Sequence, residues 1–168
     1  FETIRCLHGR PFALEDHWKR LSTGANALKI RLPLNCQELH QHTSQLLSIN
    51  QLEERDAGVR LTITRGTGQR GLSPPLQSKP LVLITCFPVA ADPMHPVSVM
   101  ISNMVVNEHS PLSAFKTLAY TDNIIARQQA LAQGYDDALL CNTKGHIVSA
   151  SSANVFLVID QELHTPAL

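Results

Sequence analysis

The chain has 168 residues, a length that fits one domain or two small ones. Fourteen Lys and Arg side chains balance 14 Asp and Glu side chains, and this zero net charge argues against nucleic-acid binding or a polybasic membrane anchor. Apolar residues make up 43% and charged residues 17%, proportions typical of a chain that buries a core. No apolar run approaches the ~20 residues that a membrane-spanning helix needs.

Cysteine and histidine spacing bears on metals and on the compartment. The four cysteines lie far apart without a CxxC pair, and the eight histidines form no HExxH pattern, so we expect no metal site. We expect four reduced thiols in a cytoplasmic protein. Because there is no initiator Met and Phe1 already belongs to a strand-like pattern, we also expect a fragment of a longer chain.

Apolar periodicity over the first half of the chain predicts strands and helices of an α+β unit. Asn35 and Glu38 are spaced as a capping box, which predicts the start of a helix. The predicted elements are, in order, strands over 1–7 and 10–14, a helix over 15–28, a helix after residue 35, an amphipathic strand over 59–64, a loop over 66–80 and a continuous apolar strand over 81–87.

The second half of the chain predicts another strand-rich unit. We expect a helix over 118–133 that ends at Gly134 and buries a stripe of Ile124, Ile125, Leu131 and Ala132. Two prolines without periodicity predict a linker over 90–96, which would separate a domain over 1–89 from one over 97–168. The predicted strands are 97–106, 138–141, 146–149 and 154–159, with a turn over 142–145.

Three features could carry chemistry. The loop TRGTGQRG, residues 64–71, places Arg70 beside glycines, and is equally consistent with an anion site and with an ordinary turn. Lys116 lies among apolar neighbours that could lower its pKa and favour Schiff-base chemistry, although most lysines are simply solvated. Arg20 lies on a predicted helix, where an arginine usually extends its charge to solvent.

Four segments together resemble the class IV pyridoxal-phosphate aminotransferases. They are FETIRCLHGRPFALEDHWKRL (1–21), TRGTGQRG (64–71), FKTLAYTDNIIARQQA (115–130) and GHIVSASSANVFLV (145–158). The resemblance covers essentially the whole chain. It implies the two-domain α+β fold of the D-amino-acid aminotransferase type, with a truncated second domain, because family members run longer at both ends.

The resemblance also implies a role for individual residues. Lys116 matches the lysine that forms the Schiff base with pyridoxal 5'-phosphate and moves the Cα proton. Arg20 matches the arginine that binds the cofactor phosphate, and Tyr120 a tyrosine beside the cofactor's phenolic oxygen. Arg70 matches a position that binds the substrate carboxylate in D-amino-acid aminotransferase.

One departure from the family pattern bears on the reaction. Ser149 stands where the family usually has a glutamate that pairs with the protonated pyridine nitrogen. A serine favours that protonation less, which should weaken the electron sink on which transamination depends. Leu72 replaces a histidine of the D-amino-acid aminotransferases, so that activity is disfavoured.

The segments resemble the 4-amino-4-deoxychorismate lyase branch most. We therefore expect a lyase that eliminates pyruvate and leaves 4-aminobenzoate for folate synthesis. A branched-chain or D-amino-acid aminotransferase is the first alternative, and a non-catalytic relative the second. By resemblance we expect a small-molecule amino substrate and a homodimer, with no nucleic-acid or membrane partner.

Overall fold

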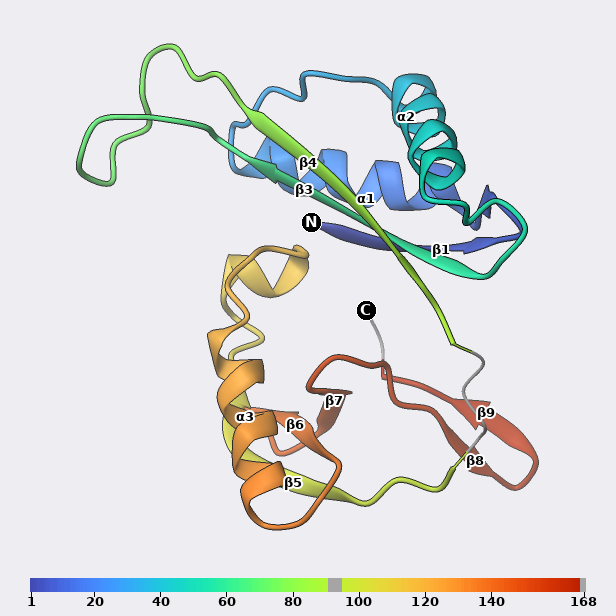
Figure 1. Ribbon diagram of the computed structural model, residues 1–168. Helices are drawn as coiled ribbons and strands as arrows, with labels where there is room; N and C mark the ends of the chain where they lie inside the picture. Colours follow the sequence, from blue (N-terminus) through green and yellow to red (C-terminus); the bar gives the residue numbers. More distant parts are fainter. Residues whose placement is uncertain (91–94, 167–168) are drawn as a thin grey trace. The chain divides into compact units, whose positions relative to one another are not determined.

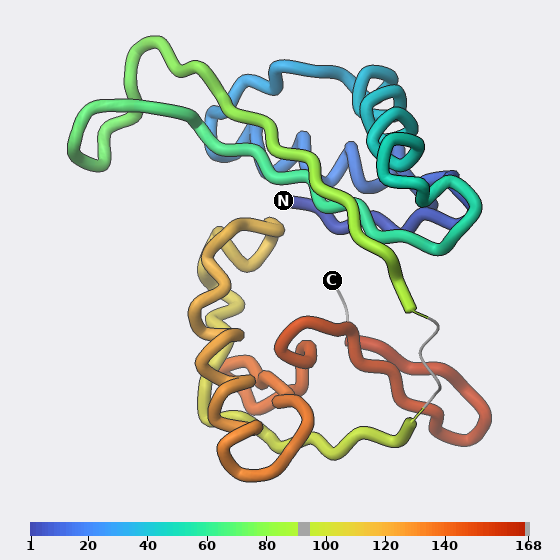
Figure 2. Tube along the Cα trace, in the orientation of Figure 1, coloured from blue at the N-terminus to red at the C-terminus, as the bar shows by residue number. Residues whose placement is uncertain are grey.

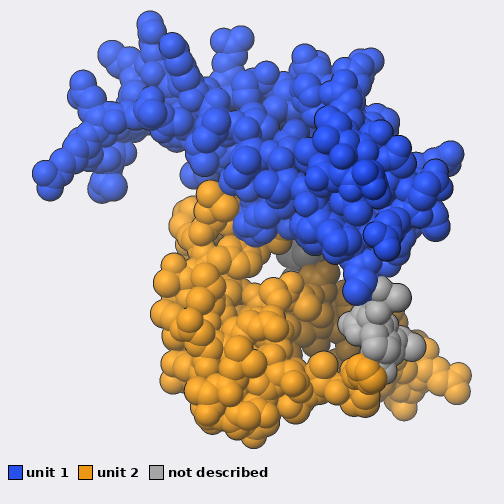
Figure 3. All heavy atoms as spheres, in the orientation of Figure 1, with its two compact units in different colours: residues 1–91 blue, residues 92–168 orange. Residues whose placement is uncertain are grey.

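The computed structural model describes residues 1–90 and 95–166. The chain divides into two compact units, Phe1–Ala91 and Asp92–Leu168, which are coloured separately in Figure 3. The linker predicted over 90–96 falls largely outside the described residues, because 91–94 are not described. Its limits therefore stay a prediction, and each unit is described by itself.

The first unit is an antiparallel sheet covered on one face by two helices (Figure 1). The strand order is β2-β1-β3-β4. The elements are β1 (Glu2–Leu7), β2 (Arg10–Pro11), α1 (Leu14–Ala27), α2 (Cys36–Ile49), β3 (Ala57–Thr64) and β4 (Leu81–Pro88). The loop between β3 and β4 extends away from the sheet, as its trace shows in Figure 2, and confirms the loop predicted over 66–80.

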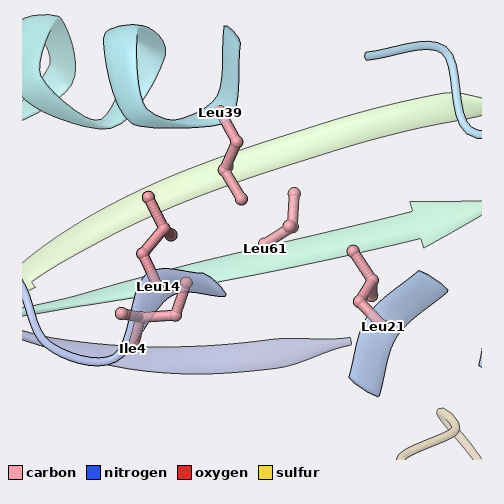
Figure 4. Close-up of a cluster of buried hydrophobic side chains, with 5 residues drawn as sticks. All are labelled: Ile4, Leu14, Leu21, Leu39 and Leu61. Carbon is pink, nitrogen blue, oxygen red and sulfur yellow. The ribbon is translucent and has the colours of Figure 1, made fainter. Parts of the chain in front are cut away.

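The core of this unit lies between the sheet and both helices. Its buried side chains point toward one another in Figure 4, and they come from β1, α1, α2 and β3: Ile4, Leu14, Leu21, Leu39 and Leu61. Ile4 and Cys6 are buried while Thr3 and Arg5 are exposed, which is the alternation that a half-buried strand requires.

One predicted strand of this unit differs from the structure. The strand expected over 10–14 ends at Pro11, because proline has no N–H for the ladder, and α1 already begins at Leu14. The strand predicted over 81–87 is confirmed as β4. Leu81 and Leu83 are exposed, since helices cover one face of the sheet.

The second unit contains a three-stranded sheet, β5-β6-β7, and a hairpin of two short strands. β5 and β6 are parallel and are connected through α3, whereas β6 and β7 are antiparallel. The elements are β5 (Val99–Val106), the 3₁₀ helix η1 (Pro111–Ala114), α3 (Thr121–Ala132), β6 (Asp137–Asn142), β7 (Ile147–Ala150), β8 (Leu157–Ile159) and β9 (Glu162–His164).

The face of α3 that packs on the sheet is not the predicted one. Ala126 and Ala130 are the buried residues, and they contact a cluster that includes Ala138 and Leu140. The predicted stripe of Ile124, Ile125, Leu131 and Ala132 is exposed, so that prediction was wrong. Small alanine side chains allow the helix axis to lie close to the strands, and a search for large apolar residues overlooks them. Gly134 adopts a φ of 84° just after the helix, as the predicted stop requires.

The capping box at the start of α2 is confirmed and gives a direct test of the fold. The Asn35 side chain accepts a hydrogen bond from Glu38 N, and the Glu38 carboxylate accepts one from Asn35 N. Asn35→Ala should lower the free energy of unfolding by about 1 kcal/mol, because one backbone donor loses its partner. Urea unfolding measures this loss. Ser44→Ala on the exposed side of the same helix is the control, and an equal loss in both variants would contradict a specific capping effect.

Candidate active site

A cavity of about 430 Å³ lies in the second unit, where β5 gives way to the connection that leads to α3. Its wall combines the end of β5, the turns before α3, the first turn of α3, and residues of β6 and β7. The carboxyl ends of parallel strands are where open sheets usually bind ligands, and this volume suits a small molecule.

Lys116 is held beside this cavity by Tyr120. The Lys116 Nζ donates a hydrogen bond to the Tyr120 Oη across 3.1 Å, and Tyr120 lines the cavity. Phe115 and Thr117, the neighbours of Lys116 on both sides, line it as well. The Lys116 side chain is therefore bonded to a residue of the wall, although Lys116 itself does not line the cavity.

The backbone explains how these two side chains meet. Thr117 N donates to Phe115 O, and Tyr120 N donates to Leu118 O, so two tight turns separate η1 from α3. These turns bring Lys116 back toward Tyr120 before the helix starts. A regular helix over 118–133, as the sequence predicts, would begin three residues earlier than α3 does.

Ser149 contributes to another part of the cavity wall. It lies on β7, half-buried, opposite Leu140 of β6, and both residues line the cavity together with Val148. The wall therefore combines a hydroxyl with apolar side chains that can pack against a flat ring.

A carboxylate stabilises the connection that carries the cavity residues. Glu108 accepts hydrogen bonds from Thr143 N, at 3.1 Å, and from Thr143 Oγ1, at 2.7 Å. These bonds, the side-chain hydroxyl foremost, lower the pKa of Glu108 to about 2. These hydrogen bonds connect the turn between β6 and β7 to the segment that follows β5. Asn107, the residue before Glu108 in that segment, lines the cavity.

Arg20 lies in the first unit, on α1, and binds a buried carboxylate. Its Nε and Nη2 donate to Glu2 Oε1 and Oε2 across 2.7 and 2.5 Å. His17 Nδ1 lies 2.7 Å from Glu2 Oε2 and hydrogen-bonds it as well. Burial alone would raise the pKa of Glu2, but the bonds from Arg20 and His17 outweigh burial and lower it. Glu2 is fully buried, whereas the Arg20 side chain is 54% exposed.

Arg70 lies in the exposed loop between β3 and β4. Of the five predicted site residues, Tyr120 and Ser149 line the cavity, and Lys116 is linked to it by the hydrogen bond to Tyr120. Arg20 and Arg70 belong to the other unit.

Glu2 and His17 were missed as members of a polar cluster. The alternation of β1 could have predicted that Glu2 is buried, because Glu2 lies on the same side of the strand as Ile4 and Cys6. A buried carboxylate needs partners, and His17 and Arg20 are one helical turn apart.

The described residues form neither a metal-binding cluster nor a membrane-spanning helix. Across 1–90 and 95–166, no group of three or more His, Cys, Asp or Glu side chains could hold a metal ion. Within the same residues, no helix is long and apolar enough to span a bilayer.

Comparison with known proteins defines the class of this chain. Residues 1–168 match the family described as Amino-transferase class IV, and the chain belongs to that family. It has the α+β fold of class IV aminotransferases.

Individual relatives include both enzyme types. A putative branched-chain-amino-acid aminotransferase of Methanocaldococcus jannaschii is 34% identical over 99% of this chain and 58% of its own length. An aminodeoxychorismate lyase of Bacillus subtilis is 26% identical over 100% of this chain and 58% of its own. The crystal structure of a putative 4-amino-4-deoxychorismate lyase from Legionella pneumophila superposes with a TM-score of 0.83 and 30% identity, over 98% of this chain and 60% of that one.

All three relatives are longer than this chain. The chain spans about three fifths of the length of each of them. Of the three, the branched-chain aminotransferase has the highest identity to this chain. The comparisons therefore show the family, and they do not single out the lyase branch that the sequence favours.

The family uses pyridoxal phosphate, and the chemistry of the cavity fits that group. Lys116 has an amine, which reacts with aldehydes, and the Tyr120 hydroxyl is bonded to it at the edge of the cavity. Ser149 adds a second hydroxyl to the wall, and Leu140 and Val148 add apolar surface, so the wall suits a polar aromatic ring.

The Glu2 cluster predicts how acid affects the first unit. Since the folded-state pKa of Glu2 lies below its usual value of 4.5, its contribution to stability is full above that value and is lost as the pH falls through the lower, folded-state pKa. The free energy of unfolding should therefore fall more steeply from about pH 6 to about pH 3 in the wild type than in Glu2→Gln. Urea unfolding at several pH values measures this, and parallel pH profiles would contradict it.

Proposed function

We propose that the protein is a pyridoxal-phosphate enzyme that acts on a small amino compound, with Lys116 as its catalytic residue. The supporting observation is the hydrogen bond from Lys116 Nζ to Tyr120 Oη at the wall of the cavity that Ser149 also lines. Within this class we propose a lyase of the aminodeoxychorismate type, which eliminates pyruvate from its substrate and leaves 4-aminobenzoate.

In this proposal the residues of the cavity hold the reactants and move one proton. When bound, the cofactor supplies an electron sink for the bonding pair of the substrate Cα–H bond. Lys116 Nζ would hold the cofactor covalently, and when it is not so engaged it would be the base that takes the Cα proton. Tyr120 Oη, which belongs to the cavity wall, would hold Nζ next to the cavity through the hydrogen bond between them.

Two arginines are proposed to bind anions, on the resemblance to family members. Arg20 would bind the cofactor phosphate, for which its partly exposed guanidinium is suited. Arg70 would bind the substrate carboxylate from the exposed loop between β3 and β4. We also propose a homodimer, because family enzymes are typically dimeric.

Ser149 supports elimination over amino transfer. A hydroxyl hydrogen-bonds a ring nitrogen but leaves it without the negative partner that favours its protonation. A less protonated ring withdraws electrons less strongly, so a long-lived carbanion is poorly stabilised. A reaction that expels a leaving group promptly tolerates this better than a transamination does.

A branched-chain or D-amino-acid aminotransferase is the second candidate. The branched-chain activity is favoured by the 34% identity to the Methanocaldococcus relative that carries this name. A transaminase converts the cofactor to its amine form with one amino acid, whereas a lyase returns it to the aldehyde form, so the two candidates differ in their half-reactions.

Cofactor binding by Lys116 is tested by titration. Pyridoxal phosphate added to the full-length protein should produce a new visible absorbance band that is absent from Lys116→Ala. Lys144→Ala, in the exposed turn between β6 and β7, is the matched control and should keep the band. A band that persists in Lys116→Ala would contradict the proposal, and absence of any band in the wild type would support a non-catalytic relative.

The role of Ser149 is tested by restoring a carboxylate. Ser149→Glu should raise the rate of amino transfer from leucine to a 2-oxo acid by about tenfold or more, because one added charge contact to the ring nitrogen is of that order. Release of pyruvate from aminodeoxychorismate by the wild type is measured beside it, with Ser149→Ala as the control. Rapid amino transfer and no pyruvate release by the wild type would replace the lyase by the aminotransferase.

A further inference from the structure

We propose that Asn123 is a positioning residue that holds the end of β7, and with it Ser149, at the wall of the cavity in the second unit. The inference rests on the proposed function, in which the Ser149 hydroxyl meets the ring nitrogen of the cofactor. Asn123 acts through the backbone that carries Ser149, and all residues concerned belong to the second unit.

Asn123 connects two parts of the cavity wall. It lies half-buried in the first turn of α3 and lines the cavity. Its Nδ2 donates a hydrogen bond to the carbonyl oxygen of Ser151 across 2.8 Å. Ser151 follows the last residue of β7 and lies two residues after Ser149, which lines the cavity as well. One amide side chain therefore links the helix to the strand that carries the hydroxyl.

Ser151 is also held from a second direction. It is buried, and its Oγ donates a hydrogen bond to Asp137 Oδ1 at the start of β6. Ala150 N donates to Ala153 O across 2.9 Å, so the chain turns back immediately after β7. The carbonyl of Ser151 is thus bonded from α3 and its hydroxyl from β6, and the residue is fixed between the two elements.

The strand pairing of β7 is limited. It has four residues and, among the residues that the structure describes, it pairs with β6 alone. The register of that pairing shifts next to Ser149, between its partner Leu140 and the following Cys141. Because a short edge strand with an irregular register is held by few ladder hydrogen bonds, a side-chain bond just beyond its end adds a restraint close to Ser149.

A second bond from α3 to the same turn is exposed. Arg127, one helical turn after Asn123, donates to Ser152 Oγ across 3.3 Å, and water competes with this bond. The bond from Asn123 is partly buried. Its loss deprives the carbonyl of a buried residue of that donor, which costs more than the loss of an exposed bond. Asn123 is therefore the connection on which the position of the turn depends more strongly.

Hydrogen exchange measures this restraint without any ligand. In Asn123→Ala of the full-length protein, the amides of residues 149–153 should exchange about fivefold faster, because the turn opens more readily. Alanine is the best helix former, so α3 itself is not weakened. Gln128→Ala removes an amide from the exposed side of the same helix and should leave the exchange unchanged. Exchange in Asn123→Ala at the wild-type rate would overturn the restraint.

Two ligands test whether the restraint acts on Ser149. Pyridoxal 5'-phosphate and its deaza analogue, in which a C–H group replaces the ring nitrogen, differ at that one ring position. The ratio of their dissociation constants, measured by absorbance titration, therefore reports the contact to the ring nitrogen. Asn123→Ala should reduce the preference for pyridoxal phosphate about fivefold, the order expected for one weakened hydrogen bond. A general loosening of the cavity would weaken both ligands alike and leave the ratio unchanged.

A double-mutant cycle tests whether Asn123 acts through Ser149. Ser149→Ala should remove most of the preference, and adding Asn123→Ala to Ser149→Ala should lower it no further. Gln128→Ala should keep the wild-type preference. If Asn123→Ala does not fold, Ser151→Ala, which removes the bond to Asp137, should reduce the preference in the same direction.

The outcomes separate this inference from the proposed function. An unchanged preference in Asn123→Ala, with the preference lost in Ser149→Ala, would overturn the positioning role and leave the proposed function intact. A further loss in the double variant would also overturn it, because Asn123 would then act without Ser149. A wild type that forms no visible band with either ligand would contradict the proposed function itself.

Discussion

The hydrogen bond between Lys116 Nζ and Tyr120 Oη is the contact on which the functional account depends. It joins a primary amine to a phenol at the wall of the cavity in the second unit. The bond spans two tight turns, since α3 starts at Thr121 and not at the earlier residue that periodicity predicts.

Local sequence patterns predicted the elements that short-range interactions determine. The capping box at Asn35 formed as expected, because both of its hydrogen bonds are made within three residues. The alternation over 59–64 likewise became β3. The stripe on α3 was predicted wrongly, because the choice of buried face depends on β5 and β6. A helix that lies close to its sheet buries Ala126 and leaves the larger Ile124 exposed.

Less of the candidate site could be predicted from the residues alone. Lys116, Tyr120 and Ser149 were predicted through family resemblance, and the cavity that Tyr120 and Ser149 line is formed by elements far apart in sequence. Glu2 was missed, although its position in the alternation of β1 placed it on the buried face. Its partners lie on α1, and only the packing of that helix on β1 brings a carboxylate and a guanidinium together.

The central claim is that Lys116 is the residue that binds pyridoxal phosphate covalently. Borohydride reduction of the full-length protein after incubation with the cofactor, followed by peptide mapping, tests it most directly. The account predicts that the cofactor is fixed to the peptide containing Phe115-Lys116-Thr117. Labelling of a different lysine, such as Lys79 or Lys144, or no labelling at all, would contradict it.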